Sequence, residues 1–188
     1  EAARAKALFA LVDFYLNRQD ASTAATASKS LLDLDPKSAP ALLVSGMLHE
    51  QRESYPTART AYEQALQAYP SFLPAQRQLA VLLADHLVDD QRAQELANVL
   101  RVELVGDPVV SRILGKIAYR KGDHREAARL LTESASRGTA DADLLYYLGM
   151  AQFHSKDNRA KATLNRALGM DPSAKISEEA KKAIAQLQ

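Results

Sequence analysis

Small apolar residues recur along the chain at nearly constant distances, and polar runs separate them. Within residues 45–70, Gly46 is followed by Ala58, Tyr62 and Ala65 at offsets of 12, 16 and 19. Apolar residues three or four positions apart share one face of a helix, whereas a polar run between two such patterns marks a turn. The pattern therefore predicts two helices joined by a turn, with a proline after the second helix.

The same spacing returns throughout the chain. The small residues of the predicted first helices are Gly46, Ala80, Gly115 and Gly149, which lie 34, 35 and 34 residues apart. The third copy has one extra residue in its turn, and the fifth has one residue fewer. A period in the low thirties is typical of stacked helical hairpins. It predicts five hairpins, at about 5–38, 39–72, 73–107, 108–141 and 142–173.

The small residues have a structural role in this interpretation. Gly46 and Ala58 fall where the two helices of one hairpin cross, and small residues let helix axes approach closely. Several boundaries agree with the same frame: Asp107 precedes Pro108 as an N-cap before a helical proline, Asp123 and Glu126 have the spacing of a capping box, and Gly138 is a helix stop. We assign no chemistry to these positions.

The last residues, 174–188, form one more amphipathic pattern. Its apolar side consists of Ile176, Ala180, Ala183, Ile184 and Leu187. A single helix after the last hairpin covers the open end of a stack of repeats. The alternative is a sixth repeat of which only the beginning is present.

Taken together, these copies resemble the tetratricopeptide repeat, a 34-residue helix–turn–helix unit with Leu-Gly, alanine, aromatic and proline positions. The second copy matches best, whereas the first has Val12 at the small position and the fourth lacks the closing proline. The resemblance implies an all-α fold, an α-solenoid of stacked antiparallel helix pairs in a right-handed superhelix. It implies one domain over residues 1–188, with a C-terminal capping helix at 174–188.

The resemblance also implies a binding surface, because partners of this family usually lie along the concave side formed by the first helices. The inward positions that we select as a partner-binding groove are Phe9, Asp13, Leu43, Met47, Glu50, Arg77, Arg112, Lys116, Tyr119, Arg120, Tyr146, Met150, Phe153 and His154. One subset of the family clamps the C-terminal carboxylate of chaperones with a Lys/Asn/Arg set. Phe9 and Asp13 stand at the places of that Lys and Asn, which argues against such a clamp.

The fourth and fifth copies hold the most distinctive part of this groove. Arg112, Lys116 and Arg120 are spaced four residues apart, so they form one basic stripe on a helix. Tyr119 and Phe153 are among the aromatic residues next to it, and aromatic residues with arginine are typical of interface hot spots. We expect a peptide with acidic and apolar side chains. In the alternative interpretation, the aromatic residues pack between helices and the stripe is solvated.

The bulk composition makes several classes of protein less favoured. Among 188 residues the net charge is +1, which does not favour a nucleic-acid binder. Residues 1–111 contain 10 Lys and Arg against 14 Asp and Glu, and residues 112–188 contain 14 against 9. No apolar run approaches the length of a membrane span, so we expect no membrane span in this segment. The chain starts at Glu1 without a signal-peptide pattern, so we expect a mature form or part of a longer chain and leave the compartment, cytoplasm or periplasm, undecided.

Catalytic and metal-binding patterns are missing from the sequence. It contains no cysteine, and the four histidines do not have the spacing of paired metal ligands. His86 and His124 fall in or beside turns and are expected to be solvated. We therefore expect no enzyme activity, no metal and no cofactor.

The expected function is a protein–protein interaction scaffold or adaptor. The alanine-rich, irregular repeats resemble bacterial proteins of secretion, pilus or exopolysaccharide export assemblies. The alternatives are an RNA-binding helical-repeat protein, which the net charge of +1 does not favour, and a regulatory segment of a larger enzyme. Self-association is a further alternative.

Overall fold

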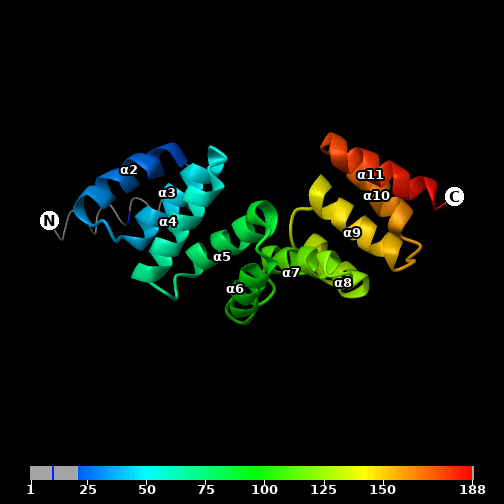
Figure 1. The fold of residues 1–188 in the computed structure, drawn as a ribbon, viewed down its shortest axis with the longest axis horizontal. Helices are drawn as coiled ribbons and strands as arrows, with labels where there is room; N and C mark the ends of the chain where they lie inside the picture. The colour runs from blue at the N-terminus through cyan, green and yellow to red at the C-terminus, as the bar shows by residue number, and fades with distance from the viewer. Residues whose placement is uncertain (1–9, 11–20, 188) are drawn as a thin grey trace. The chain divides into compact units, whose positions relative to one another are not determined.

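The computed structural model describes residue 10 and residues 21–187, and all regular structure within this part of the chain is helical (Figure 1). Contacts group the chain into two compact units, Glu1–Ala93 and Gln94–Gln188, and each is described by itself. The predicted all-α class of stacked helix pairs is confirmed. The expected single domain over the whole chain stays a prediction.

The helices follow one another as short antiparallel pairs. Unit 1 contains α2 (Ala21–Leu34), α3 (Ala39–Gln51), α4 (Tyr55–Ala68), α5 (Leu73–Leu82), the π-helix η1 (Leu83–Leu87) and the start of α6 (Asp90–Glu103). Unit 2 contains the rest of α6, then α7 (Pro108–Arg120), α8 (His124–Arg137), α9 (Ala142–His154), α10 (Ala160–Leu168) and α11 (Ala174–Ala185). Within unit 2, α7 packs on α8, α8 on α9, and α9 on α10 and α11.

Each described glycine of a first helix lies against a large side chain of the second. A Cβ on Gly115 would lie 2.7 Å from Cγ of Leu131, which is fully buried. A Cβ on Gly46 would likewise lie too close to the ring of Tyr62. The anchoring alanines Ala58 and Ala127 are also fully buried. The small residues thus create the space that the large residues fill, as the spacing predicts.

The extra residue of the third copy is taken up at the end of its first helix. After Leu82 the helix widens into the π-helix Leu83–Leu87, and Val88 follows in the left-handed conformation with φ 52°. A π-turn holds one residue more than an α-turn, so the extra residue fits within the end of the first helix. Val88 is 62% exposed and carries the backbone strain of a β-branched residue at positive φ.

The predicted helix boundaries hold in unit 2. The carboxylate of Asp107 accepts hydrogen bonds from the N–H groups of Val109 and Val110 at 2.7 and 3.4 Å, with Pro108 as the first helical residue. Asp123 accepts from the N–H of Glu126 at 3.2 Å, which is one half of the predicted capping box.

The predicted C-terminal helix is present as α11. Ala180 and Ala183 are buried in a cluster with residues of α9 and α10, and Ile176 and Ile184 pack against the same cluster. Lys181 and Lys182 are exposed on its other side. This helix covers the end of the last pair, as an amphipathic cap should. Whether it is a cap or the beginning of a sixth repeat stays a prediction.

Candidate functional site

The first helices of unit 2, α7 and α9, carry eight of the fourteen predicted groove residues. Asp107 caps the start of α7 and Asp141 caps the start of α9, where its carboxylate accepts from the N–H of Leu144 at 2.8 Å. Because α7 contacts α9 and α9 contacts α11, these three helices form one continuous face, which we call the α7–α9–α11 face.

The basic stripe of α7 meets two aspartates at the start of α9. The guanidinium of Arg112 donates to Asp141 and Asp143, each at 2.7 Å, and Lys116 Nζ lies 3.0 Å from Asp143. Lys116 is only 5% exposed. The charges of Arg112 and Lys116 are therefore already balanced within the chain, which the sequence interpretation did not anticipate.

This ion cluster shifts the pKa of its members. Burial alone would raise the pKa of Asp141, but the Leu144 N–H and the Arg112 guanidinium outweigh burial and lower it. Burial likewise opposes the charge of Arg112, and its two carboxylate partners raise its pKa further above the ordinary value. Both groups are held in their charged forms, so the cluster fixes the relative position of α7 and α9.

An aromatic cluster continues from the ion cluster. Lys116 Nζ lies 4.7 Å from the centre of the Tyr147 ring, a cation–π contact. Tyr119 meets Tyr147 edge to face with 5.4 Å between the ring centres. Tyr119 and Tyr147 are partly buried, so each ring also presents surface to solvent. Tyr147 was not selected from the sequence.

Three further predicted residues, Tyr146, Met150 and Phe153, lie toward α11. Tyr146 is 6% exposed, and its hydroxyl is hydrogen-bonded to the carboxylate of Glu179 in α11. Burial, followed by this hydrogen bond, raises the pKa of Tyr146 above its usual range. Met150 and Phe153 are partly buried against the same cluster. Tyr146 thus packs between helices, which is the alternative that the sequence left open.

His154 ends α9 in a group of rings. Its ring stacks on His124 with 4.5 Å between centres and lies 6.1 Å from that of Tyr119. The expectation of a solvated His124 was wrong: this residue is half-buried, and its Nδ1 is buried without a hydrogen-bond partner. Its turn position suggested exposure, but the end of the neighbouring α9 covers it. His86, in contrast, is exposed as expected and stacks on Tyr55.

The remaining predicted residues belong to unit 1. Leu43 is buried, whereas Met47 and Arg77 are half-buried. Glu50 is hydrogen-bonded to the hydroxyl of Tyr62, and burial raises the pKa of Glu50. Phe9 and Asp13 lie outside the described residues. Arg120 of unit 2 is half-buried at the end of α7.

Asp141 and Asp143 were not selected from the sequence, although one feature of their position could have indicated them. Asp141 and Asp143 lie 29 and 31 residues after Arg112, close to one repeat period. Residues separated by about one period occupy neighbouring first helices, so opposite charges at this distance can meet. Which of these opposite charges form pairs depends on side-chain geometry, and the residue spacing alone does not fix that geometry.

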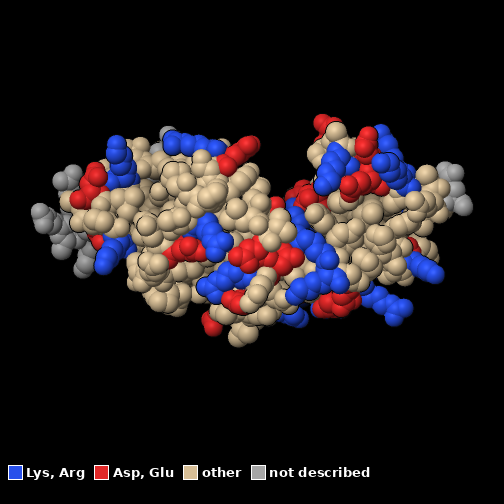
Figure 2. All heavy atoms as spheres, viewed as in Figure 1, with Lys and Arg blue, Asp and Glu red and all other residues tan. Residues whose placement is uncertain are grey.

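Clustered metal ligands and helices suited to span a membrane are both absent from the described part of the chain. There, no three His, Cys, Asp or Glu side chains gather as metal ligands would. None of the helices described combines the length and the apolar character that crossing a bilayer requires. Lys/Arg and Asp/Glu side chains are interspersed on the face shown in Figure 2.

Solved structures with the same fold come from several repeat proteins. MamA 41-end from Desulfovibrio magneticus RS-1 is 14% identical, with a TM-score of 0.67, over 91% of this chain and 97% of that chain. YrrB, described as a TPR protein with an unusual peptide-binding site, is 19% identical, with a TM-score of 0.66, over 93% and 90%. The pilF protein of Pseudomonas aeruginosa is 16% identical, with a TM-score of 0.65, over 96% and 98%. At these identities the likeness shows the fold alone.

Sequence comparison identifies the family directly. No curated protein matches the chain significantly. The family model of the tetratricopeptide repeat, however, matches residues 9–72, 43–101 and 114–175. These matches span most of the chain, and this repeat fold serves in general as a scaffold for protein–protein interaction. The chain belongs to the tetratricopeptide repeat family.

Proposed function

We propose that the protein is an interaction scaffold that binds a peptide or a helix of a partner protein on the α7–α9–α11 face of unit 2. The observation that carries the proposal is the row of partly buried Tyr119, Tyr147, Met150 and Phe153 on a face that ion pairs hold in place. Half-exposed aromatic and methionine side chains on rigid helices are typical of interface anchors.

The charges on this face refine the ligand that the sequence predicted. Since Arg112 and Lys116 already pair with Asp141 and Asp143, an acidic ligand would have to compete with internal carboxylates. Apolar and aromatic side chains of a partner meet no such competition. The ligand that fits this face is therefore mainly apolar, with polar groups at its edges.

The cellular context is part of the proposal. The irregular, alanine-rich repeats favour a bacterial secretion, pilus or exopolysaccharide export assembly, and structures from Desulfovibrio magneticus and Pseudomonas aeruginosa share the fold. The groove residues of unit 1, Leu43, Met47, Glu50 and Arg77, are proposed as a binding segment of that unit by itself. Phe9 and Asp13 are proposed on the sequence alone.

Site-specific photo-crosslinking tests the binding face. A photoreactive phenylalanine analogue at Met150 or Phe153 should form adducts with a partner in the source cells. The same analogue at Lys161, an exposed residue of α10, is the control. Adducts from Lys161 but from neither face position would contradict the proposal. Tight, salt-sensitive retention of RNA in a filter assay would instead support the RNA-binding alternative.

A further inference from the structure

The turn between α9 and α10 differs from the equivalent turns of the other pairs. α4, α6 and α8 each begin three residues before the anchoring alanine of their repeat, which is Ala58, Ala93 or Ala127. α10 begins at its anchoring alanine, Ala160. The fifth repeat therefore lacks the first turn of its second helix. The cause lies in the sequence, because this repeat has one residue fewer between its glycine and its alanine.

Side-chain hydrogen bonds order the segment that replaces this helical turn. The carboxylate of Asp157 accepts from the N–H of Arg159 at 2.9 Å and from its guanidinium at 2.6 Å. Ser155 Oγ donates to the carbonyl of Ala151 at 2.8 Å. Lys156 takes the left-handed conformation that reverses the chain, with φ 60°. The segment is thus a defined turn rather than an unravelled helix end.

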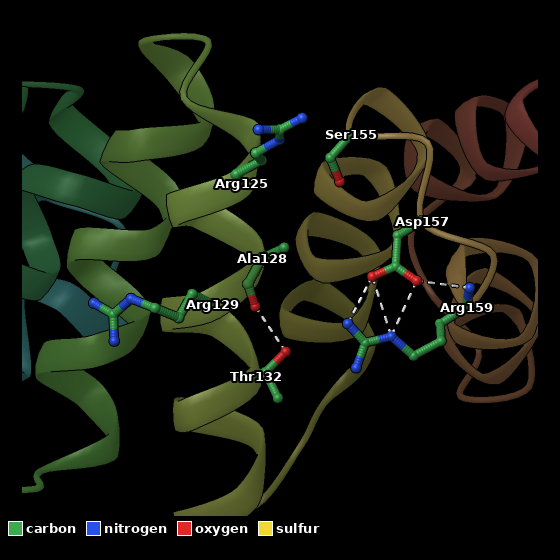
Figure 3. Close-up of a pocket in the computed structure, with 7 residues that line it drawn as sticks. All are labelled: Arg125, Ala128, Arg129, Thr132, Ser155, Asp157 and Arg159. Carbon is green, nitrogen blue, oxygen red and sulfur yellow. Dashed lines mark hydrogen bonds and ion pairs between the residues drawn. The ribbon is translucent and has the colours of Figure 1, made fainter.

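The missing helical turn leaves a groove beside α8. The groove has a volume of about 530 Å³, with α8 on one side and the α9–α10 turn on the other (Figure 3). We call it the α8 groove. Its lining residues are Arg125, Ala128, Arg129, Thr132, Ser155, Asp157 and Arg159.

Three arginines and one aspartate give the α8 groove a positive charge. Arg129 is balanced by Glu126 at 2.6 Å, and Arg159 by Asp157. Arg125 is exposed, and its side chain makes no ion pair or hydrogen bond with any residue that the structure describes. In Figure 3 the guanidinium of Arg125 extends toward the α9–α10 turn, whereas that of Arg129 extends away from it. Arg125 is therefore the cation that a ligand in the groove can use.

A second hollow prolongs the α8 groove past Arg125 and Ser155, which line both. It measures about 460 Å³, and its other lining residues are Gly122, Asp123, His124, His154 and Lys156. Lys156 is exposed there and adds a further positive charge. Asp123 is already engaged as the N-cap of α8. The two hollows thus adjoin each other, and together their linings hold more positive than negative groups.

We propose that the α8 groove binds an acidic, extended segment of a protein partner, with a carboxylate of that segment paired to Arg125. Two adjoining hollows of about 530 and 460 Å³ offer more room than a single small anion needs, which suits a peptide segment. The seven lining residues of the α8 groove include no aromatic ring, so it lacks the stacking surface that single-stranded nucleic acid requires. None of these seven residues belongs to the groove predicted from the sequence, although the hollow that adjoins the α8 groove reaches one residue of that predicted groove, His154.

A binding titration tests the proposal with a defined probe, a short fluorescein-labelled peptide in which glutamate alternates with serine. Arg125→Glu should weaken binding about fivefold to tenfold, because it turns an attraction of one exposed charge pair into a repulsion. Arg166→Glu is the matched control, since Arg166 is an exposed residue of α10 outside the groove and the net charge changes equally. It should leave the affinity within a factor of two or so of the wild type.

A second variant tests shape rather than charge. Thr132 is an exposed residue of α8 in the groove, and Thr132→Trp fills the space without changing any charge. It should weaken binding of the glutamate peptide to a similar degree as Arg125→Glu. Circular dichroism and thermal unfolding show whether each variant keeps the helical fold.

Several results would overturn the proposal. One is an equal loss in Arg125→Glu and Arg166→Glu, which would mean a general effect of net charge. Another is full binding by Thr132→Trp, which would place the peptide elsewhere. Arg125-dependent binding of inorganic phosphate or of a short RNA without binding of the peptide would assign the groove to a different ligand. None of these variants alters Met150 or Phe153, so failure here is distinguishable from failure of the α7–α9–α11 face.

Discussion

Leu164 of α10 fills the space that Gly149 of α9 leaves open: a Cβ on Gly149 would lie 2.6 Å from Cδ2 of Leu164 and 3.2 Å from its backbone nitrogen. Leu164 is fully buried and Gly149 is buried as well. Because the backbone of α10 is one of the close atoms, rotation of the leucine side chain alone cannot make room. Close approach of the two helices therefore depends on the absence of a side chain at this position.

Gly149→Ala should accordingly destabilise unit 2 by about 1–3 kcal/mol, the usual cost of overpacking a core. Urea unfolding followed by circular dichroism measures this change. Gly169→Ala is the control, because a Cβ there would meet its nearest atom at an ordinary 3.5 Å. The control should stay within about 0.5 kcal/mol of the wild type, as for surface substitutions. Equal stability of the two variants would contradict the proposed role of Gly149.

Asp143→Asn should remove the carboxylate that lies 3.0 Å from Lys116 Nζ, in a site where the lysine side chain is only 6% exposed. Removing one partner of a fully buried ion pair costs about 3–5 kcal/mol. Since the Asp143 side chain is 35% exposed, we expect a smaller loss, of about 1–3 kcal/mol. The measurement is the free energy of unfolding in urea.

A matched control for Asp143→Asn is Glu133→Gln on α8. Glu133 lies 3.7 Å from Arg129 and 3.8 Å from Arg137, and both arginine side chains are 52% exposed. Exposed pairs contribute about 0–1 kcal/mol, so this change should be nearly neutral. If Asp143→Asn were equally neutral, the ion cluster would not hold α7 and α9 together.

The stability of unit 2 should depend on His154 in weakly acidic solution. Burial, followed by repulsion from His124, lowers the pKa of His154 below its ordinary value of 6.5. The unfolded chain then binds this proton more readily than the folded chain, so the contribution is fully present above about pH 6.5 and is lost as pH falls toward the lowered pKa.

His154→Asn should therefore reduce the loss of stability when the pH is lowered from about 7.5 to 5.5. Urea midpoints at both pH values, for the wild type and the variant, give the answer. His86→Asn is the control, because His86 is exposed in unit 1 and lies outside the pair. An unchanged pH dependence in His154→Asn would show that the stacked histidines do not sense pH.

Val88→Asn should stabilise unit 1. Val88 has φ 52° and ψ 41°, and left-handed backbone costs an ordinary L-residue about 1–2 kcal/mol, whereas asparagine tolerates it. We expect a gain of about 1 kcal/mol, seen as a higher urea midpoint. Val88→Ala removes the β-branch but lacks the short polar side chain that lets asparagine tolerate this conformation, so it should gain less. A loss of stability in Val88→Asn would mean that the valine side chain makes contacts worth more than the strain.

Much of the fold follows from local patterns that recur with the repeat period. The caps at Asp107 and Asp123 and the stop after Arg137 were all predicted, because each depends on a few neighbouring residues. Even the irregular spacing of the third repeat was visible as one additional residue. Its outcome, a π-helix ending at Leu87, was not predicted, since an added residue can equally lengthen a loop.

The candidate sites were less predictable, because they depend on which side chains meet across helices. Arg112 and Lys116 were expected to face a ligand, yet Asp141 and Asp143 reach them from the next hairpin. Tyr146 was selected as a groove residue, but its hydroxyl bonds to Glu179 of α11. The sequence did not indicate Arg125 as a binding residue, because its neighbouring residues do not distinguish it from the other exposed arginines.

The sequence by itself determined the helical hairpins, their period and the positions at which helices touch. It could do so because glycine and alanine must recur wherever two backbones approach. The regular spacing of these residues therefore marks the positions of close approach. Only the tertiary structure decided which charges of the surface are neutralised and where space is left between repeats. Both outcomes depend on side-chain directions and on a single missing residue before α10, and their effects appear only when neighbouring helices pack.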